Sequence, residues 1–234
     1  NRLLSYGRAG KGLRGMRALK FAGKQAATKM LSVKFQVGRT GVITPVAVLA
    51  PVQLAGVIVS RATLHNEDEI KKLGVRKGDT VIVERAGDVI PAVIQALPDL
   101  RDGSEKSIRM PKKCPSCKEK LSRVSGEVAW RCRNKECRAQ HRESLYHFVS
   151  RKALDLDGLG PKIIDQLVEE GLVTEYADLW KVREGDLEGL DRFAAKSAKN
   201  FVATLQSRKL IPLSRFVYAL GIRHVGEETA IDLA

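Results

Sequence analysis

Three kinds of hydrophobic pattern follow one another along the chain. From Ser32 to about Leu97, short runs rich in β-branched residues alternate with glycine and proline, as strands and turns do. After the last cysteine, apolar residues recur at helical spacing, beginning with Leu145, Phe148 and Val149. Between these regions lies a segment with neither period that contains every cysteine of the chain. The pattern predicts a multidomain α+β protein with a β domain, a small irregular module and an all-α domain.

The β region divides into runs that are each expected to form one strand: SVKFQV, GVITPVAVL, AGVIVSRATL, DTVIVERAG and VIPAVIQAL. Between the third and fourth runs, HNEDEIKKLG predicts a short helix with Asn66 as its N-cap and Gly74 as its stop. A few short strands with one helical insertion favour a small closed barrel of the OB type. A generic β-sandwich is the alternative.

The helical region contains an internal repeat. Residues 154–171, 187–206 and 216–234 each hold an apolar residue, a turn with glycine and an amphipathic helix, and they start about thirty residues apart. Glycine lets such turns bend tightly and approach another surface closely, and Pro161 fits the first position of a helix. The amide groups at such a helix start can hold a DNA phosphate, as in a helix-hairpin-helix. The candidate phosphate-binding residues are Gly158, Gly160, Gly221 and Gly226.

Two points qualify the reading of the repeat. The middle copy has Asp191 and Arg192 where a second glycine would stand, so we expect it to be structural. A plain αα-hairpin with a glycine cap and no ligand is the alternative for the other two copies.

The cysteines form two close pairs that bracket a short insert. Their spacing is C-x2-C, fourteen residues, then C-x4-C, at Cys114, Cys117, Cys132 and Cys137. Such pairs can place four thiolates around a structural Zn2+, and four thiolates leave no open position for catalysis. Two disulfides are the alternative, but they require an oxidising compartment, and no export signal is visible. His141 and His147 follow closely and are expected to be ordinary helix-face residues.

Charge adds a second argument for nucleic acid. The formal net charge is +14, and residues 1–66 hold 11 basic and no acidic side chains. Residues 153–234, by contrast, hold 10 basic and 14 acidic side chains. Basic blocks attract phosphate backbones, although solvated surface charge is the alternative interpretation.

The longest apolar stretch, Val46 to Val59, is interrupted and too short for a membrane span. We therefore expect a cytoplasmic protein without membrane contact, and a fragment of something longer.

These parts in this order resemble the C-terminal half of bacterial NAD-dependent DNA ligase. The resemblance is carried by QVGRTGVITPVAVLAPV, ATLHNEDEI and RAGDVIP in the barrel, by LDLDGLG and ALGIRHVGEETA in the repeats, and by the cysteine spacing. It covers roughly residues 18–234. It implies a remnant of the adenylation domain at 1–30, an OB-fold at 31–110, a zinc finger at 111–140 and a truncated helix-hairpin-helix domain at 141–234.

The resemblance also implies an activity. The family seals nicks in duplex DNA during replication and repair, using NAD as the source of AMP, with Mg2+. The AMP-accepting lysine of the family lies in a K-x-D-G motif, and no K-x-D-G occurs here. We therefore expect this chain alone to be inactive. RALKFAG resembles the end of the adenylation domain and places Lys20 on a lysine that contacts the adenylate phosphate, although Leu19 and Ala22 depart from the pattern.

In the barrel, the family's DNA-contacting positions fall on Arg39, Thr40, Arg85, Val89 and Ile90. The arginines suit phosphates, and the two apolar residues suit a widened minor groove. Without the resemblance, the two apolar residues would be assigned to the core of a strand. His65 is a further candidate, with a turn or capping role as the alternative.

Two other functions remain open from sequence. The first is a non-catalytic DNA-binding scaffold with zinc and helix-hairpin-helix parts, and the second is an RNA-binding zinc-ribbon protein. An adenylation domain upstream in the full gene would distinguish the ligase from both.

Overall fold

The computed structural model describes residues 23–85, 90–124, 126–187, 189–191 and 193–234. The chain forms two compact units, which we describe separately. The barrel unit comprises residues 1–33, 46–64 and 70–108, and the helical unit comprises residues 34–45, 65–69 and 109–234. Lys20 and Val89 lie outside the described residues.

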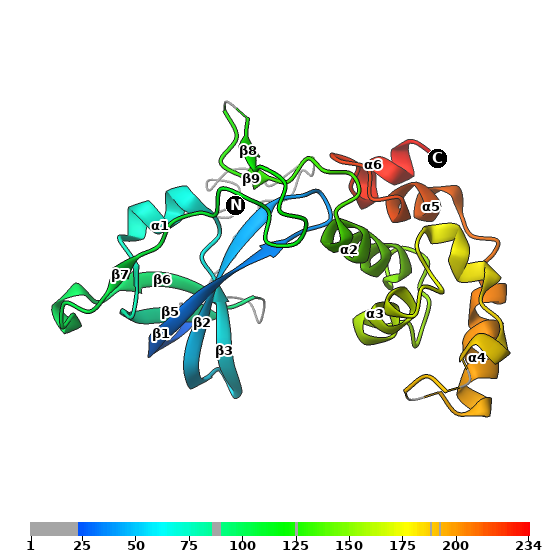
Figure 1. Cartoon of the computed structure of the whole chain (residues 1–234), viewed down its shortest axis with the longest axis horizontal. Helices are drawn as coiled ribbons and strands as arrows, with labels where there is room; N and C mark the ends of the chain where they lie inside the picture. Colours follow the sequence, from blue (N-terminus) through cyan, green and yellow to red (C-terminus); the bar gives the residue numbers. More distant parts are fainter. Residues whose placement is uncertain (1–22, 86–89, 125, 188, 192) are drawn as a thin grey trace, which may run out of the picture. The chain divides into compact units, whose positions relative to one another are not determined.

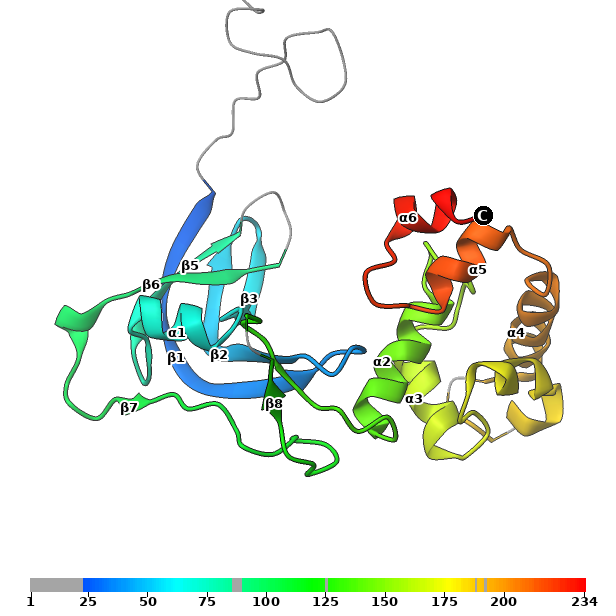
Figure 2. The ribbon, with the colours of Figure 1, turned by 90° about the horizontal axis from the view of Figure 1, so that it is seen from above.

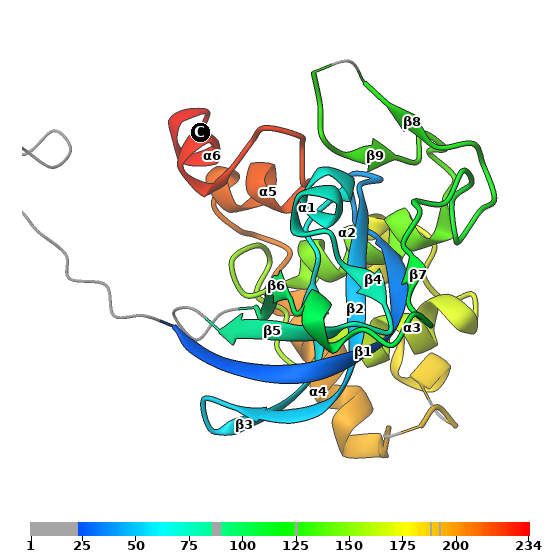
Figure 3. The same cartoon turned by 90° about the vertical axis from the view of Figure 1, so that its left-hand side faces the viewer.

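The barrel unit is a closed barrel with strand order β1-β2-β3-β6-β5, in which β5 pairs back with β1 (Figures 1 and 3). The pairs β1–β5, β2–β3 and β5–β6 are antiparallel, whereas β3 and β6 are parallel at Thr63 and Ala92. In β2, buried residues alternate with half-buried ones, so one face of the strand fills the barrel. The barrel strands are β1 (Lys24–Val37), β2 (Ile43–Leu54), β3 (Val57–Thr63), β5 (Thr80–Arg85) and β6 (Ala92–Ala96).

The barrel prediction is confirmed, and a β-sandwich is not what forms. Each strand falls on one predicted run, but β1 begins at Lys24, ahead of the domain boundary expected at residue 31. The register of β2 against β3 shifts between Val48 and Val52, where Pro51 cannot donate a ladder hydrogen bond.

The predicted short helix is α1 (Glu67–Leu73). The amide of Glu69 donates to Oδ1 of Asn66 at 2.9 Å, which makes Asn66 the expected N-cap. The helix ends at Gly74, whose φ of +59° is a left-handed conformation that favours glycine. Ile70 turns into the barrel core. Both end signals read from the sequence are therefore confirmed.

Outside the barrel strands, the barrel unit also contains β4 (Arg76–Lys77), η2 (Pro98–Leu100) and β7 (Lys106–Ser107). An ion pair between Asp79 and Arg101 joins the residues that follow β4 to those that follow η2. Asp79 is completely buried, and both its carboxylate oxygens accept hydrogen bonds from Arg101 at 2.8 Å. The amide of Arg76 donates to the same carboxylate at 2.7 Å, and Arg101 also reaches the carbonyl of Gly74. Burial raises the pKa of Asp79, but the bonds from Arg101 and Arg76 outweigh it and hold that pKa below its usual value.

The helical unit begins with a small cysteine module. Its hairpin consists of β8 (Ser122–Arg123) and β9 (Trp130–Arg131). Three of the four cysteines are buried beside Leu121 and two apolar residues next to the β1–β2 turn, Val37 and Ile43. The module therefore shares a small core with the turn between β1 and β2.

The rest of the helical unit packs around one larger core (Figure 2). Phe148 of α2 stacks on Tyr176 with ring centroids 4.3 Å apart, and Trp180 meets the same ring edge-on. Helix α3 packs against α2, and α6 packs against α5. The elements are α2 (Arg138–Val149), α3 (Pro161–Glu169), η3 (Tyr176–Lys181), η4 (Glu184–Leu187), α4 (Ala195–Ser207), α5 (Leu213–Ala219) and α6 (Glu227–Asp232). None of the helices in the described part of the chain has the length and apolar character that crossing a membrane demands.

The Asp79–Arg101 pair yields a stability prediction. Asp79→Asn is expected to lower the free energy of unfolding of the barrel by about 2 kcal/mol at pH 7, because the buried side chain at position 79 loses its charge-assisted hydrogen bonds to Arg101 and its bond to the amide of Arg76. Since the pKa of Asp79 is lower in the folded state, its stabilisation is complete above the unfolded pKa, about 3.9, and is lost as pH falls below that value. Urea unfolding between pH 3 and 7 measures both effects. Asp99→Asn, at an exposed site nearby, is the matched control, and equal stability of the two variants would contradict the role of the pair.

Candidate nucleic-acid interface and metal centre

The four cysteines meet at one point of the helical unit. Their sulfur atoms all lie within 4.8 Å of one another, with Cys114 and Cys137 3.9 Å apart and Cys117 and Cys132 3.4 Å apart. Four thiolates at a Zn–S distance of about 2.3 Å stand about 3.8 Å apart in a tetrahedron, so the arrangement fits Zn2+. All four thiols are free, and the disulfide alternative is therefore wrong. Among the described residues, this is the only group of His, Cys, Asp and Glu side chains gathered closely enough for a metal.

The surroundings of the thiols are those of metal ligands. The backbone bends sharply after Cys117, where Lys118 has a φ of +64° and donates its amide to the carbonyl of Cys114. Burial raises the pKa of Cys117, but the amide of Glu119 and bonds from Cys132 and Asn134 bring it down to about 7. Burial raises the pKa of Cys132 to about 12, so this thiol needs a cation to become a thiolate at neutral pH. A bound zinc ion would supply that charge and link the two cysteine pairs.

The cysteine module is fixed to two other segments of the helical unit, the start of α1 and the β1–β2 turn. Indole Nε1 of Trp130 donates to Glu67 at 2.7 Å, and the guanidinium of Arg123 grips Asp68 through two hydrogen bonds. Glu67 and Asp68 open α1, where the helix dipole also favours acids. The motif HNED and the insert between the cysteine pairs are both recognisable in the sequence. Nothing in the sequence indicates that they contact each other, so these two contacts were not predicted.

The β1–β2 turn is the second segment that contacts the cysteine module. The amide of Cys132 donates to the carbonyl of Gly41 at 2.9 Å. Gly41 has a φ of +77°, and a Cβ built there would lie 2.2 Å from the carbonyl oxygen of Cys132. Only glycine allows this approach. Gly41 is the last residue of the motif QVGRTG, and this glycine is the sequence signal that could have predicted the close contact.

The predicted DNA-contacting residues of that turn take different positions. Thr40 is exposed, and its carbonyl accepts a hydrogen bond of 3.3 Å from Arg131. Arg39 packs its guanidinium against His147 and Gly221, and its Nη1 atom is buried without a hydrogen-bond partner. Arg39 is therefore directed toward the α5–α6 turn and not into open solvent. Its contact with DNA stays a prediction.

The remaining DNA-contacting candidates belong to the barrel unit and lie in or next to residues 86–89, which the structure does not describe. Arg85 ends β5, and Ile90 follows the gap at 86–89 with 72% of its surface exposed. The alternative reading of Ile90 as a core residue is therefore wrong. Its exposure leaves it available to a ligand, and the DNA contacts of Arg85, Val89 and Ile90 stay predictions.

The histidines take structural positions. His65 has a φ of +59° directly before the N-cap of α1, as a turn residue would. Nε2 of His141 bonds to the carbonyl of Lys135, and Nε2 of His147 bonds to the carbonyl of Tyr218, each at 2.8 Å. Burial lowers the pKa of His147; the hydrogen bond to the carbonyl of Tyr218 opposes this shift, and the charge of Arg39 adds to it.

The glycine turns of the repeat divide into open and covered positions. Gly158 has a φ of +84° and Gly160 is the N-cap of α3, and a Cβ at either would meet nothing within 4 Å. Gly226, the N-cap of α6, is equally open. Gly221 differs, because a Cβ there would lie 2.3 Å from Nη1 of Arg39. Three of the four candidate glycines thus face open space, as close approach of a ligand requires.

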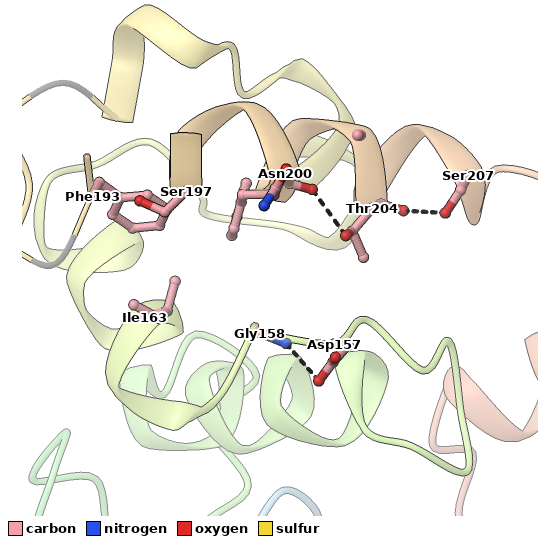
Figure 4. A pocket seen from close by; sticks show the side chains of 10 residues that line it. Asp157, Gly158, Ile163, Phe193, Ser197, Asn200, Thr204 and Ser207 are labelled. Atoms are coloured by element: carbon pink, nitrogen blue, oxygen red, sulfur yellow. Dashed lines mark hydrogen bonds between the residues drawn. The ribbon is translucent and has the colours of Figure 1, made fainter. Parts of the chain in front are cut away.

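A groove of about 740 Å³ lies beside the first glycine turn (Figure 4). One wall is the turn at Asp157 and Gly158, and the other is the polar face of α4. The hydroxyls of Thr204 and Ser207 donate to carbonyls of their own helix, so the wall is polar but uncharged. The middle repeat was expected to be structural, and its polar face was not predicted. The signal was present as helically spaced Ser197, Asn200, Thr204 and Ser207.

The cysteine cluster yields a metal prediction. Protein purified under reducing conditions is expected to contain one zinc ion per chain, and Cys132→Ser is expected to lose it, as measured by elemental analysis. Because the thiols must release protons to bind, zinc affinity should fall as pH decreases from 8 to 6. Ser122→Ala, in the same hairpin but outside the cluster, should keep its zinc. A zinc-free wild-type protein with reduced thiols would contradict the assignment.

Comparison with known families agrees with this geometry. The model of the NAD-dependent DNA ligase OB-fold domain matches residues 27–105, which cover most of the barrel strands. The model of the NAD-dependent DNA ligase C4 zinc finger domain matches residues 113–139, which contain all four cysteines. This chain therefore carries, one directly after the other, the OB-fold domain and the C4 zinc finger domain of an NAD-dependent DNA ligase.

Proposed function

We propose that this chain is the part of a DNA ligase that holds nicked duplex DNA while a separate adenylation domain seals the nick. One observation carries the proposal: a closed OB barrel is followed immediately by a four-thiol cluster, and both match the ligase family. The open glycine turns after the cluster support it, because they suit backbone phosphates. The enzyme acts where bacterial DNA lies, in the cytoplasm at the nucleoid, as a monomer.

Two kinds of contact hold the duplex in this proposal. Arg85 attracts phosphates through charge, and exposed Ile90, with Val89, presses into the minor groove. Arg39 is the second charged candidate, and it has to turn away from Gly221 to reach a phosphate. The turns at Gly158–Gly160 and Gly221–Gly226, which we take as helix-hairpin-helix motifs, bind through backbone amides. Backbone amides suit this region because residues 153–234 hold more acidic than basic side chains. Neither kind of contact reads base sequence.

The chemistry of the parent enzyme needs groups beyond this chain's described residues. In the parent enzyme, NAD would supply the AMP for the 5′-phosphate, and Mg2+ would supply positive charge for phosphoryl transfer. We assign Lys20 to the adenylate phosphate on resemblance alone. Without a K-x-D-G lysine, this chain contributes DNA binding and orientation but no nucleophile.

Binding through the open glycines yields a prediction. Gly160→Ala is expected to weaken binding to a nicked duplex about tenfold, because the new methyl group keeps a phosphate from the amides at the start of α3. Fluorescence anisotropy at several salt concentrations measures the affinity. Gly185→Ala is the matched control, since that glycine also faces open space but lies in η4, outside the turns.

A second comparison separates amide contacts from charge contacts. Arg85→Ala should reduce the slope of log affinity against log salt by about one, as loss of a single phosphate contact does, with no change in sequence preference. If Gly160→Ala is folded by circular dichroism and binds like Gly185→Ala, the repeats are scaffolding.

Reconstitution tests the ligase assignment. The chain incubated with NAD and Mg2+ should remain unlabelled by adenylate, because it has no K-x-D-G lysine. Adding an NAD-dependent adenylation domain as a separate protein should restore sealing of nicked duplex in a gel assay. A stable protein–AMP adduct on this chain alone would refute its non-catalytic role. DNA binding without any gain in sealing would favour the scaffold function instead.

A further inference from the structure

Two arginines from distant parts of the sequence meet at one carboxylate in the helical unit. Arg131 lies on β9 beside the cysteine cluster, and Arg223 lies in the turn between α5 and α6. Nε of Arg131 lies 2.9 Å from Oε2 of Glu127, and Nη2 of Arg223 donates to Oε1 of the same side chain. One carboxylate thus bridges two guanidinium groups, and they bring its pKa down to about 2, with Arg223 contributing most.

The positions of these groups are set by other contacts. The carbonyl of Glu127 accepts a hydrogen bond of 2.7 Å from Nε of Arg123, which itself holds Asp68. Nη1 of Arg131 points to the carbonyl and hydroxyl of Thr40, at 3.3 and 3.4 Å. Arg131 would therefore keep its orientation if the carboxylate of Glu127 swung away.

The meeting point is partly open to solvent, with Arg223 the most exposed of the three side chains and Arg131 the least. The side chains of Arg131, Glu127 and Arg223 are 17%, 28% and 47% exposed. An external anion can therefore reach both arginines, and Glu127 can rotate into water, where a carboxylate is well solvated.

We propose that Arg131 and Arg223 form a binding site for a backbone phosphate of DNA, which Glu127 occupies as an internal substitute until DNA displaces it. The proposal rests on the proposed function, because DNA is the source of the phosphate. Guanidinium groups bind carboxylates and phosphates with the same paired geometry, so the carboxylate marks where phosphate oxygens fit.

The surroundings favour a phosphate of an extended backbone. Arg223 belongs to the turn from Gly221 to Gly226, and Gly226 at the end of that turn faces open space. Thr40 is exposed beside Arg131 and offers a hydroxyl. A strand that passes this point would meet two arginines and a hydroxyl.

The competing explanation is an ordinary ion pair that only fastens the cysteine hairpin to the α5–α6 turn. The two explanations predict opposite results for the same substitution. Removing the charge of Glu127 vacates a phosphate site in the first case and loosens a DNA-binding unit in the second.

Glu127→Gln is therefore the decisive variant, with Glu169→Gln as its matched control. Each removes one negative charge from the helical unit, and Glu169 likewise pairs with an arginine, Arg142, at 2.9 Å. Glu127→Gln should bind nicked duplex about fivefold more tightly than Glu169→Gln in fluorescence anisotropy at fixed salt. Adding Arg223→Ala to Glu127→Gln should cancel the gain. Circular dichroism and zinc content verify that each variant is folded.

Several results would overturn the inference. If wild-type protein binds nicked duplex but Glu127→Gln binds no more tightly than Glu169→Gln, the pair is only a fastening. If Glu127→Gln gains affinity for inorganic phosphate but not for duplex, the assignment to the DNA backbone is wrong. If the wild-type protein itself fails to bind duplex, the proposed function fails and the inference fails with it.

Discussion

The close contact between Gly41 and Cys132 is the constraint on which the rest of the helical unit depends. The turn between β1 and β2 must pass so near a cysteine of the cluster that any Cβ would collide with the carbonyl of Cys132. That approach lets the amide of Cys132 bond to Gly41 and buries Val37 and Ile43 beside the thiols. A module this small cannot bury enough apolar surface by itself. The core that it shares with the β1–β2 turn and the ligation of a metal together compensate for the small apolar area that the module buries. The metal site and the β1–β2 turn therefore stabilise each other.

The chain has a basic N-terminal region and an acidic C-terminal region, and each matches a different way of binding a phosphate. Basic side chains do so through charge, and helix starts do so through amides that carry no net charge. Residues 1–66 have no acid and suit the first way, whereas residues 153–234 have an excess of acids and suit the second. Open space around Gly160 and Gly226 is what the second way needs, because amides act only at short range. Gly221 is filled by Arg39, so the two turns are not equivalent despite their similar sequences.

The features that were predicted correctly from the sequence are those formed between residues close together in the chain. The cap of α1 by Asn66 and its end at Gly74 are local events, and both were predicted and observed. The strands of the barrel and the ligand set of the metal follow from short-range patterns for the same reason. The pairs Asp79–Arg101 and Glu127–Arg223 join residues 22 and 96 positions apart, and nothing local marks either partner. The burial of Nη1 of Arg39 was likewise invisible, because it depends on where His147 and Gly221 lie after folding.

These pairings change how the net charge of +14 should be read. Several arginines of the helical unit already hold carboxylates, among them Arg123, Arg142, Arg208 and Arg223. An arginine that is paired in this way gains little by exchanging one anion for another of equal charge. A single phosphate group in solution therefore binds such an arginine only slightly better than the internal carboxylate does. A duplex backbone presents many phosphates at fixed spacing, so once one is held the next arrives at high effective concentration. Internal carboxylates then select for ordered polyanions over small ones, and an acidic helical unit becomes compatible with DNA binding.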